Sequence, residues 1–366
     1  MDKNLIPPNI LILSPSLSAV SGVSSHVNQL LNADLLNEFR FVHFQVGSEG
    51  RNERPVTKVL RLIGSIFQFP AALVRERIDI VHLNTSMDFK GYWRDIAYLL
   101  WAKVLGKKVV YQTHAGADSN HFFKKDGFSF LKKWLLGLPD AVILLSNIEK
   151  GAAEGFCRFK RLQVIPNAID LESYSEIHPK EFNDDTLTLG FISRLTGTKG
   201  IFESIEAIAT LRSRGIKNLR LVVAGSGPDE ALIRKKVNDL KLDNQVHILG
   251  SIFGEKKLAF WSEIEILLFP TYHQEGLPYV ILESLASGTP LVTTEIGGIP
   301  DAVENGVQGV IVPPKNVNAL ADAIESLISD REKLRVMSFA CREKAQNQYS
   351  IDRLAKDFSA VYRVIA

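Results

Sequence analysis

The 366-residue sequence contains little cysteine and no long hydrophobic run. Its two cysteines, Cys157 and Cys341, lie far apart with no CxxC spacing, which argues against a disulfide framework or a zinc site. No stretch approaches the roughly 20 apolar residues of a membrane-spanning helix, and Met1–Asn4 lacks the basic and then apolar pattern of a signal peptide. We therefore expect a cytoplasmic protein that touches a membrane at most peripherally.

The chain also lacks a strong net charge. The value of +2 at pH 7 argues against a nucleic-acid partner. The charge is unevenly distributed, because residues 1–170 carry 21 Lys and Arg against 15 Asp and Glu, and the remainder carries 22 against 26. A positive first half suits an anionic partner such as a membrane surface or a phosphorylated substrate, although ordinary variation of surface charge explains it equally well.

Short apolar runs alternate with helical patterns along the whole chain. Nearly continuous runs such as residues 10–13 are typical of strands that are buried on both faces in a parallel sheet. The candidate strands are Asn9–Ser16, Phe39–Gly47, Ile78–Asn84, Lys107–Ala115, Ala141–Ser146 and Leu162–Ala168, and then Leu187–Arg194, Leu219–Gly225, Gln245–Ile252, Ile264–Pro270, Pro290–Glu295 and Gly309–Val312. Helical patterns include Val23–Leu36, Asp95–Leu105, Gly200–Arg214, Asp229–Leu240 and Val317–Ser329. The pattern predicts an α/β fold of two Rossmann-like, doubly wound parallel sheets.

The predicted domains are residues 1–170 and 187–348. Between them, residues 171–186 are polar and acidic and contain a proline, which is typical of a linker. Residues 349–366 form a helical pattern with no strand after it. Ligands of open α/β sheets bind beyond the carboxyl ends of the strands, so we expect the two sheets to face each other across a ligand-binding cleft.

The most informative segment is residues 269–298. A strand ends at Phe269, a loop carries Glu275, and a helix begins near Pro278, where a proline fits the first turn. Glu283 falls inside an otherwise apolar helix, where a carboxylate needs a partner. A ligand diol supplies one, because two hydroxyls can donate to a single carboxylate. The alternatives are that Glu283 pairs with a buried arginine or lies on an exposed stripe of the helix.

The sequence E-G-L-P-Y-V-I-L-E, followed by S-L-A-S-G-T-P and G-G-I-P-D, resembles the signature of glycosyltransferase family 4, which has the retaining GT-B fold. The resemblance implies that Glu283 holds the ribose hydroxyls of a nucleotide sugar. It also implies that the transferred sugar is held by Glu275, Gly276, Leu277 and Pro278. The N-terminal domain would bind the acceptor, the C-terminal domain the donor, and the last helix would cross back to the first domain.

Two further loops match the same family. Arg194 ends a strand, and Lys199 precedes a helix, so two cations near a helix N-terminus suit a departing pyrophosphate. The family pattern implies this role for both, and a solvated basic loop is the alternative. Gly225 and Gly227 form a tight turn that resembles the G-x-G-P loop of the family, and Ile252 follows the strand expected to border the nucleobase.

The N-terminal half matches the family less closely. Residues 18–26 resemble its glycine-rich loop, with Gly22 kept and Ser21 replacing a glycine, which would strain the serine if that position needs a positive φ. We expect His26 on the surface of the following helix. His114 ends a strand, and the resemblance implies that it lies near the reacting sugar, where it could donate to a hydroxyl. Ala168 replaces a family glycine in a segment to which we assign a structural role.

Two segments combine basic with apolar residues. They are Lys58–Arg77 and His121–Leu136, and both suit the surface of an anionic bilayer on which a lipid-linked acceptor is found. Helices packed on the sheet, with their lysines in water, explain the same pattern.

The resemblance implies a hexosyltransferase-type enzyme that moves a sugar from a nucleotide-diphosphate sugar, with UDP favoured over GDP, to a saccharide or lipid-linked acceptor in polysaccharide or glycolipid synthesis. We expect no obligatory cofactor and no metal, since Arg194 and Lys199 supply positive charge and no cluster has metal-ligand spacing. The alternatives are a nucleotide-sugar-binding subunit without turnover, suggested by Ser21 and Ala168, and a sugar-nucleotide epimerase of the same fold.

Overall fold

The computed structural model describes residues 7–19, 21–33, 35, 38–47, 54–85, 89–114, 127–182 and 186–366. Two compact units divide the chain. The N-terminal unit comprises residues 1–168 together with 351–366, and the C-terminal unit comprises residues 169–350. The last residue of the candidate strand Lys107–Ala115 and the first part of the segment His121–Leu136 lie outside the described residues.

The N-terminal unit contains a six-stranded parallel sheet of order β2-β1-β3-β4-β5-β6. Its strands are β1 (Asn9–Ser14), β2 (Arg40–Gln45), β3 (Ile80–Thr85), β4 (Lys108–Thr113), β5 (Ala141–Leu144) and β6 (Leu162–Val164). Its helices are α1 (Gly22–Asn32), α2 (Pro55–Arg75), α3 (Phe89–Val104), α5 (Ser129–Leu136), α6 (Asn147–Phe156) and α14 (Ile351–Ile365). The central strands β1 and β3 are buried almost throughout, as their continuous apolar sequences require.

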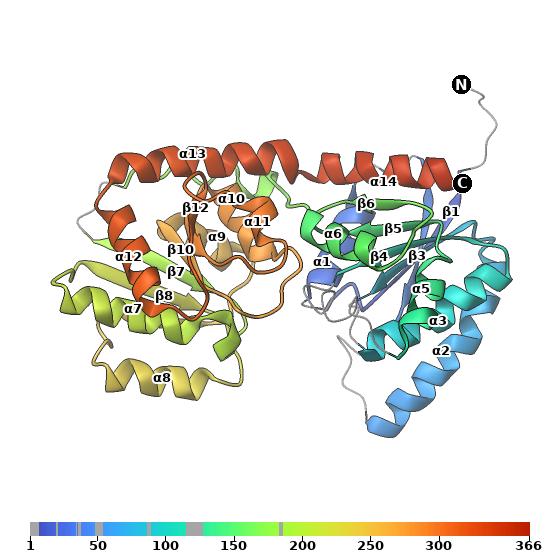
Figure 1. The fold of residues 1–366 in the computed structure, drawn as a ribbon, viewed down its shortest axis with the longest axis horizontal. Helices are drawn as coiled ribbons and strands as arrows, with labels where there is room; N and C mark the ends of the chain where they lie inside the picture. The colour runs from blue at the N-terminus through green and yellow to red at the C-terminus, as the bar shows by residue number, and fades with distance from the viewer. Residues whose placement is uncertain are drawn as a thin grey trace. The chain divides into compact units, whose positions relative to one another are not determined.

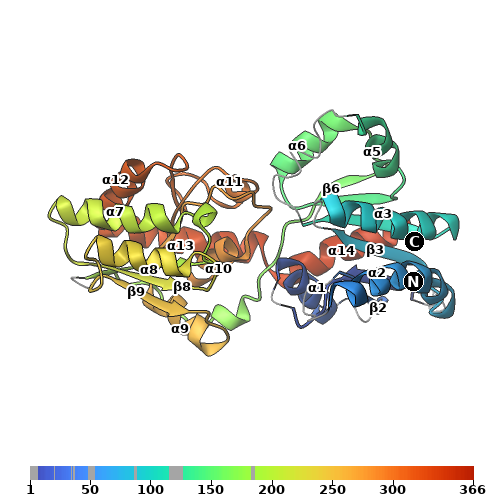
Figure 2. The same ribbon diagram turned by 90° about the horizontal axis from the view of Figure 1, so that it is seen from below.

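Helices cover both faces of this sheet. On one face, α2, α3, α5 and α6 share a core cluster with Leu11 and Leu13 of β1. On the other face, α1 and α14 pack against Ile10 and Ile12, the alternate residues of the same strand, and Figure 2 shows α14 alongside α1. The last helix of the chain is therefore part of the N-terminal unit, although the C-terminal unit precedes it in the sequence.

The C-terminal unit repeats this architecture with a parallel sheet of order β12-β11-β10-β7-β8-β9 (Figure 1). Its strands are β7 (Leu187–Ile192), β8 (Leu219–Ala224), β9 (Val246–Gly250), β10 (Ile266–Phe269), β11 (Leu291–Thr293) and β12 (Gly309–Ile311). Its helices are α7 (Ile201–Ser213), α8 (Glu230–Asp239), α9 (Glu255–Glu263), α10 (Tyr279–Ser287), α11 (Ile299–Ala302), α12 (Val317–Ile328) and α13 (Arg331–Gln348), with short 3-10 turns η1 (Glu172–Tyr174) and η2 (Gly197–Lys199).

Each predicted strand corresponds to an observed one, and this confirms the α/β fold with two parallel sheets. The polar stretch 171–186 contains more structure than its composition suggests. Ile177 and Phe182 are buried, and Phe182 belongs to the core of the C-terminal unit. Arg342 donates to the carbonyl oxygen of Ile177 at 2.6 Å, which fixes this stretch on α13.

Ser21 and His26 differ from their expected environments. Ser21 has an extended φ of −148° and caps α1 by accepting a hydrogen bond from the Ser24 backbone at 3.2 Å, so the serine is not strained. The expectation of a surface His26 is wrong. Because α1 is covered by the sheet and by α14, the imidazole is fully buried and packs edge-on against the Phe358 ring at 5.8 Å.

A second buried histidine, His82 of β3, ties α14 to the sheet. Its Nδ1 atom lies 2.7 Å from the Tyr362 hydroxyl, and its Nε2 atom lies 3.0 Å from Oε1 of Gln112. Burial lowers the pKa of His26 to about 4 and that of His82 to about 3. Both rings are therefore neutral beneath α14 at neutral pH.

We predict that the N-terminal unit loses stability on acidification. Between pH 6.5 and about 4 these histidines are protonated in the unfolded chain but neutral in the folded chain. Each histidine should therefore lower the free energy of unfolding by about 1.4 kcal/mol for each unit by which the pH falls. Urea unfolding over this range checks the slope. His26→Leu should reduce this slope by the contribution of one histidine. His178→Gln, at an exposed position, should leave the slope unchanged. An unchanged slope for His26→Leu would contradict the assignment.

Candidate active site

The candidate site lies where the C-terminal sheet reverses its order. The chain moves from β7 outward to β8 and β9, and it returns to place β10 on the other side of β7. Loops that leave β7 and β10 therefore diverge at their carboxyl ends, which is the usual ligand-binding position of a doubly wound sheet. The loop after β7 carries Arg194 and Lys199, and the loop after β10 carries Glu275.

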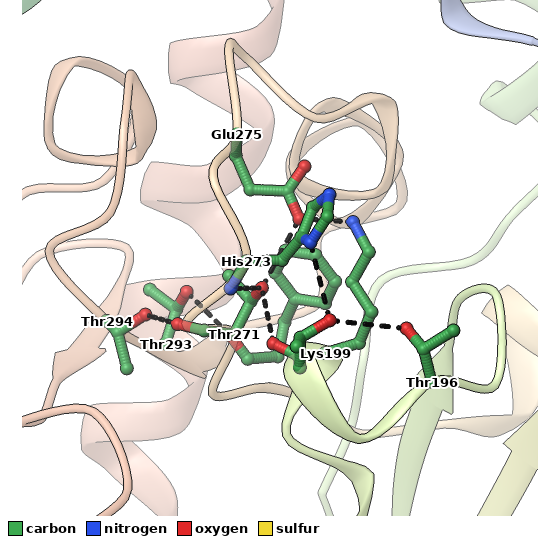
Figure 3. Close-up of polar contacts among 9 residues, drawn as sticks. Thr196, Lys199, Thr271, His273, Glu275, Thr293 and Thr294 are labelled. Carbon is green, nitrogen blue, oxygen red and sulfur yellow. Dashed lines mark hydrogen bonds and ion pairs between the residues drawn. The ribbon is translucent and has the colours of Figure 1, made fainter. Parts of the chain in front are cut away.

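Lys199 and Glu275 form an ion pair across this point, and Figure 3 shows their side chains directed at each other. Glu275 is only 9% exposed, and its carboxylate also accepts a hydrogen bond from the Thr271 hydroxyl at 3.3 Å. The Lys199 ammonium lies 5.9 Å from the centre of the Phe269 ring. The structure thus brings together two residues that the sequence analysis assigned to the diphosphate and to the transferred sugar.

Backbone contacts hold the two loops in this register. The carbonyl oxygen of Thr198 accepts hydrogen bonds from the backbone of Tyr272 and of His273, both at 2.9 Å. Gly200 has a φ of +85°, and a side chain there would overlap the Pro270 carbonyl group. The position of the Lys199 side chain is therefore set by contact between two backbones.

The Gly225–Gly227 turn packs closely against the loop after β7. A Cβ atom at Gly225 would overlap the carbonyl oxygen of Ser193, and one at Gly227 would overlap that of Leu195. Leu195 also donates to the carbonyl oxygen of Ser226 at 3.0 Å. These glycines let the loop after β8 lie directly against the loop that presents Arg194, whose side chain is exposed.

Glu283 projects from α10 and is buried, with 7% of its surface exposed. It forms an ion pair with Lys257 in the first turns of α9, which the sequence analysis did not identify. Burial raises the pKa of the Glu283 carboxyl above its ordinary value, and the Lys257 ammonium opposes that shift. No spacing signal links residues 26 positions apart, although Lys257 follows closely on the predicted base-contacting residue, Ile252.

The segment between the two glutamates leads directly into α10. Gly276 accepts a backbone hydrogen bond from Gly298 at 2.7 Å, and Leu277 is buried. Pro278 occupies the N-cap, one position before the first helical residue, so the helix begins at Tyr279. The backbone of this segment is thereby fixed between the carboxyl ends of β10 and β11.

In the N-terminal unit, His114 follows β4 at the carboxyl edge of the sheet. Its Nε2 atom lies 2.8 Å from Oδ1 of Asn84, and Nδ2 of Asn84 donates to the carbonyl oxygen of Leu13 at 3.2 Å. Because Oδ1 of Asn84 must accept, the His114 proton resides on Nε2 and the Nδ1 atom is an acceptor, which differs from the donor role expected from the sequence. Burial lowers the pKa of His114 well below its usual value, so the ring is neutral.

The His114 ring also packs edge-on against His26, with 4.8 Å between the ring centres. Gly22 is the first residue of α1, the helix that carries His26. The structure therefore gathers the predicted N-terminal residues around the carboxyl edge of β1 and β4. Among the residues that the structure describes, no group of three or more His, Cys, Asp and Glu side chains could hold a metal ion.

Comparisons with known proteins give consecutive matches along the chain. The family described as Glycosyltransferase Family 4 matches residues 34–173, and the family described as Glycosyl transferases group 1 matches residues 174–344. The chain is similar to the Anabaena protein Alr3699/HepE, which was solved in complex with UDP-glucose. The TM-score is 0.77 at 17% identity, with 97% of this chain and 99% of that chain covered.

Curated relatives match at low identity. The alpha-D-kanosaminyltransferase of Streptomyces kanamyceticus is 29% identical over 191 residues, which is 52% of this chain and 49% of the relative. The N-acetyl-alpha-D-glucosaminyl L-malate synthase of Bacillus anthracis is 23% identical over 317 residues, which is 81% of each chain. The chain spans about half the length of the curated relatives that it matches at 29% identity, namely 46% of one and 49% of another. The two consecutive matches together span residues 34–344, so the chain matches these two glycosyltransferase families along most of its length, and its two-sheet architecture is that of solved GT-B proteins.

Proposed function

We propose that the protein is a retaining hexosyltransferase that moves a sugar from a nucleotide-diphosphate sugar, UDP in preference to GDP, to a saccharide or lipid-linked acceptor in polysaccharide or glycolipid synthesis. The observation that carries this proposal is the partly buried Lys199–Glu275 pair at the switch point of the C-terminal sheet. The kinship with glycosyltransferase family 4 supports it.

The donor diphosphate binds to Lys199 and Arg194 in this proposal. A departing nucleotide diphosphate gains negative charge, and fixed cations stabilise that charge without reorganising. Glu275 pairs with Lys199 in the structure. We propose that the diphosphate replaces Glu275 as the partner of the Lys199 ammonium. The Glu275 carboxylate then accepts hydrogen bonds from the sugar hydroxyls, and the backbone of Gly276, Leu277 and Pro278 also contacts the sugar.

The nucleoside binds beside Glu283. A buried carboxylate accepts both ribose hydroxyls only while it is ionised, and the Lys257 ammonium favours that ionised form. Ile252 borders the base, and the backbone at Gly225 and Gly227 lies near the phosphates. The chain's own cations supply the charge compensation, so the proposed reaction has no obligatory cofactor.

Transfer breaks the bond between the anomeric carbon and the phosphate oxygen and forms one to an acceptor hydroxyl oxygen on the same face of the sugar. The hydroxyl proton passes to the departing diphosphate. Because the acceptor oxygen attacks the anomeric carbon directly, no protein nucleophile is needed. The protein positions the two substrates and stabilises the leaving group. His114 contributes as a hydrogen-bond acceptor, because its Nδ1 atom carries the lone pair.

The acceptor binds to the N-terminal unit, and the donor binds to the C-terminal unit. The excess of basic residues in the first half of the sequence supports an acceptor that is presented at an anionic surface. We place the protein in the cytoplasm, with peripheral contact at the inner face of a membrane.

Glu283→Gln should abolish discrimination between UDP and 2′-deoxy-UDP. The neutral amide keeps the shape of the side chain but loses the charge to which both ribose hydroxyls donate, which is worth about tenfold or more in UDP affinity. Calorimetric titration with the two nucleotides measures the ratio. Glu295→Gln, at an exposed position in the same unit, is the control and should retain the ratio of the unmodified protein. An unaltered ratio for Glu283→Gln would remove the ribose assignment.

Lys257→Met should make UDP binding more sensitive to acid. Without the ammonium, the pKa of the buried Glu283 carboxyl rises further, so the carboxylate is protonated at a higher pH. UDP affinity measured against pH should then fall at a higher pH than in the unmodified protein. The neighbouring Lys256→Met removes an exposed cation and should keep the original profile. Identical profiles for both variants would mean that Lys257 does not hold Glu283 ionised.

A further inference from the structure

Three fully buried threonines lie at the carboxyl ends of β10 and β11, beside the ion pair of the candidate site. The Thr293 hydroxyl donates to the carbonyl oxygen of Phe269 at 2.9 Å, and the Thr294 hydroxyl donates to the carbonyl oxygen of Thr271. These two hydroxyls therefore fasten one loop backbone to another. The Thr271 hydroxyl differs from them, because Figure 3 shows it directed at the side chain of Glu275.

The proton of the Thr271 hydroxyl is available to Glu275. The hydroxyl oxygen accepts a hydrogen bond from the His273 backbone at 3.1 Å, and its proton lies within reach of two acceptors. They are Oε1 of Glu275 at 3.3 Å and the carbonyl oxygen of Thr198 at 3.4 Å. Both lone pairs of that carbonyl oxygen are already used, since it accepts from the backbone of Tyr272 and of His273. The carboxylate, which is also the stronger acceptor, therefore receives the proton.

Lys199 and Thr271 donate to the same oxygen of Glu275. Both contacts end at Oε1, and Figure 3 shows the ammonium and the hydroxyl approaching this atom from different directions. In the proposed function the ammonium turns to the donor diphosphate. Because Glu275 is buried, water replaces the lost partner poorly, and Oε1 then needs a donor from the protein. The Thr271 hydroxyl is already in place to be that donor.

The position of the Thr271 hydroxyl is fixed by its surroundings. A β-branched side chain has few χ1 rotamers, so its backbone largely determines where the hydroxyl points. That backbone is held by the hydrogen bond from Thr294 and by the contacts of Tyr272 and His273 with Thr198. A donor that is fixed in advance does not have to rearrange when its acceptor loses another partner.

We propose that Thr271 is a positioning residue for Glu275. Its hydroxyl holds Oε1 once Lys199 has turned to the diphosphate, and it thereby keeps Oε2 directed at a hydroxyl of the transferred sugar. The inference rests on the proposed function and adds a determinant of specificity to it. A nucleotide without a sugar does not use Glu275, so loss of the Thr271 hydroxyl should weaken the binding of a UDP sugar and spare that of UDP. A purely structural role would weaken both equally.

Calorimetric titration of Thr271→Val with UDP and a panel of UDP sugars, beginning with UDP-glucose and UDP-N-acetylglucosamine, tests the inference. Valine keeps the branched shape and removes the hydroxyl. Relative to UDP, the UDP sugar that the unmodified protein binds most tightly should lose about tenfold or more in affinity, as expected for a hydrogen bond to a charged group. Thr271→Ser keeps the hydroxyl and should restore the ratio. Thr271→Cys, a weaker donor of similar size, should give a smaller loss and replaces the valine variant if that variant does not fold.

Thr293→Val is the matched control. It removes a buried hydroxyl of the same cluster, but one that donates to a backbone carbonyl oxygen and not to Glu275, so it should keep the ratio of the unmodified protein. An unaltered ratio in Thr271→Val, an equal loss for UDP and the UDP sugar, or the same change in Thr293→Val overturns the inference. So does a failure of Thr271→Ser to restore the ratio.

A double-mutant cycle shows whether the hydroxyl acts through Glu275. In a Glu275→Ala background both ligands still bind through the nucleoside diphosphate, and Thr271→Val should change the ratio no further. A further loss of about tenfold in that background contradicts the inference. Failure of the unmodified protein to bind UDP or any UDP sugar removes the proposed function. Normal binding of a UDP sugar with an unaltered ratio in Thr271→Val removes only the role of Thr271.

Discussion

The partly buried ion pair between Lys199 and Glu275 is the interaction on which the proposed function depends. It joins the two loops that diverge at the carboxyl edge of β7 and β10. Two charges held out of water lose solvation that their mutual attraction only partly restores, so such a pair is weak as a source of stability. Backbone contacts between Thr198 and residues 272–273 hold the loops without it. In the proposed function, the pair holds the Lys199 charge in place for the donor.

The candidate site residues of the two units differ in charge. The C-terminal unit has two ion pairs there, Glu283 with Lys257 and Glu275 with Lys199. The N-terminal unit keeps neutral imidazoles, whose low pKa values follow from burial beneath α14. This difference suits the proposed reaction, in which a diphosphate needs positive charge and a neutral acceptor hydroxyl needs a hydrogen-bond acceptor such as His114.

Much of the fold was predictable because parallel strands are buried on both faces and leave continuous apolar runs, as in residues 10–13. The same pattern placed Lys199 and Glu275 on loops at strand ends, and the family resemblance implied their roles. Contacts between distant segments were not predictable. No local sequence pattern indicates that Lys257 pairs with Glu283 or that α14 buries His26. The polarity of residues 171–186 concealed the burial of Phe182, since one aromatic anchor suffices to fix a polar segment.

The central claim is that the cations beside β7 bind a diphosphate, and the number of phosphates in the ligand tests it most directly. Calorimetric titration of the unmodified protein and of Lys199→Gln with uridine, UMP and UDP, and with GDP for comparison, gives the affinity contributed by each phosphate. We predict that UDP binds much more tightly than UMP, and that Lys199→Gln brings UDP close to UMP. Equal affinities for uridine, UMP and UDP in the unmodified protein would contradict the account.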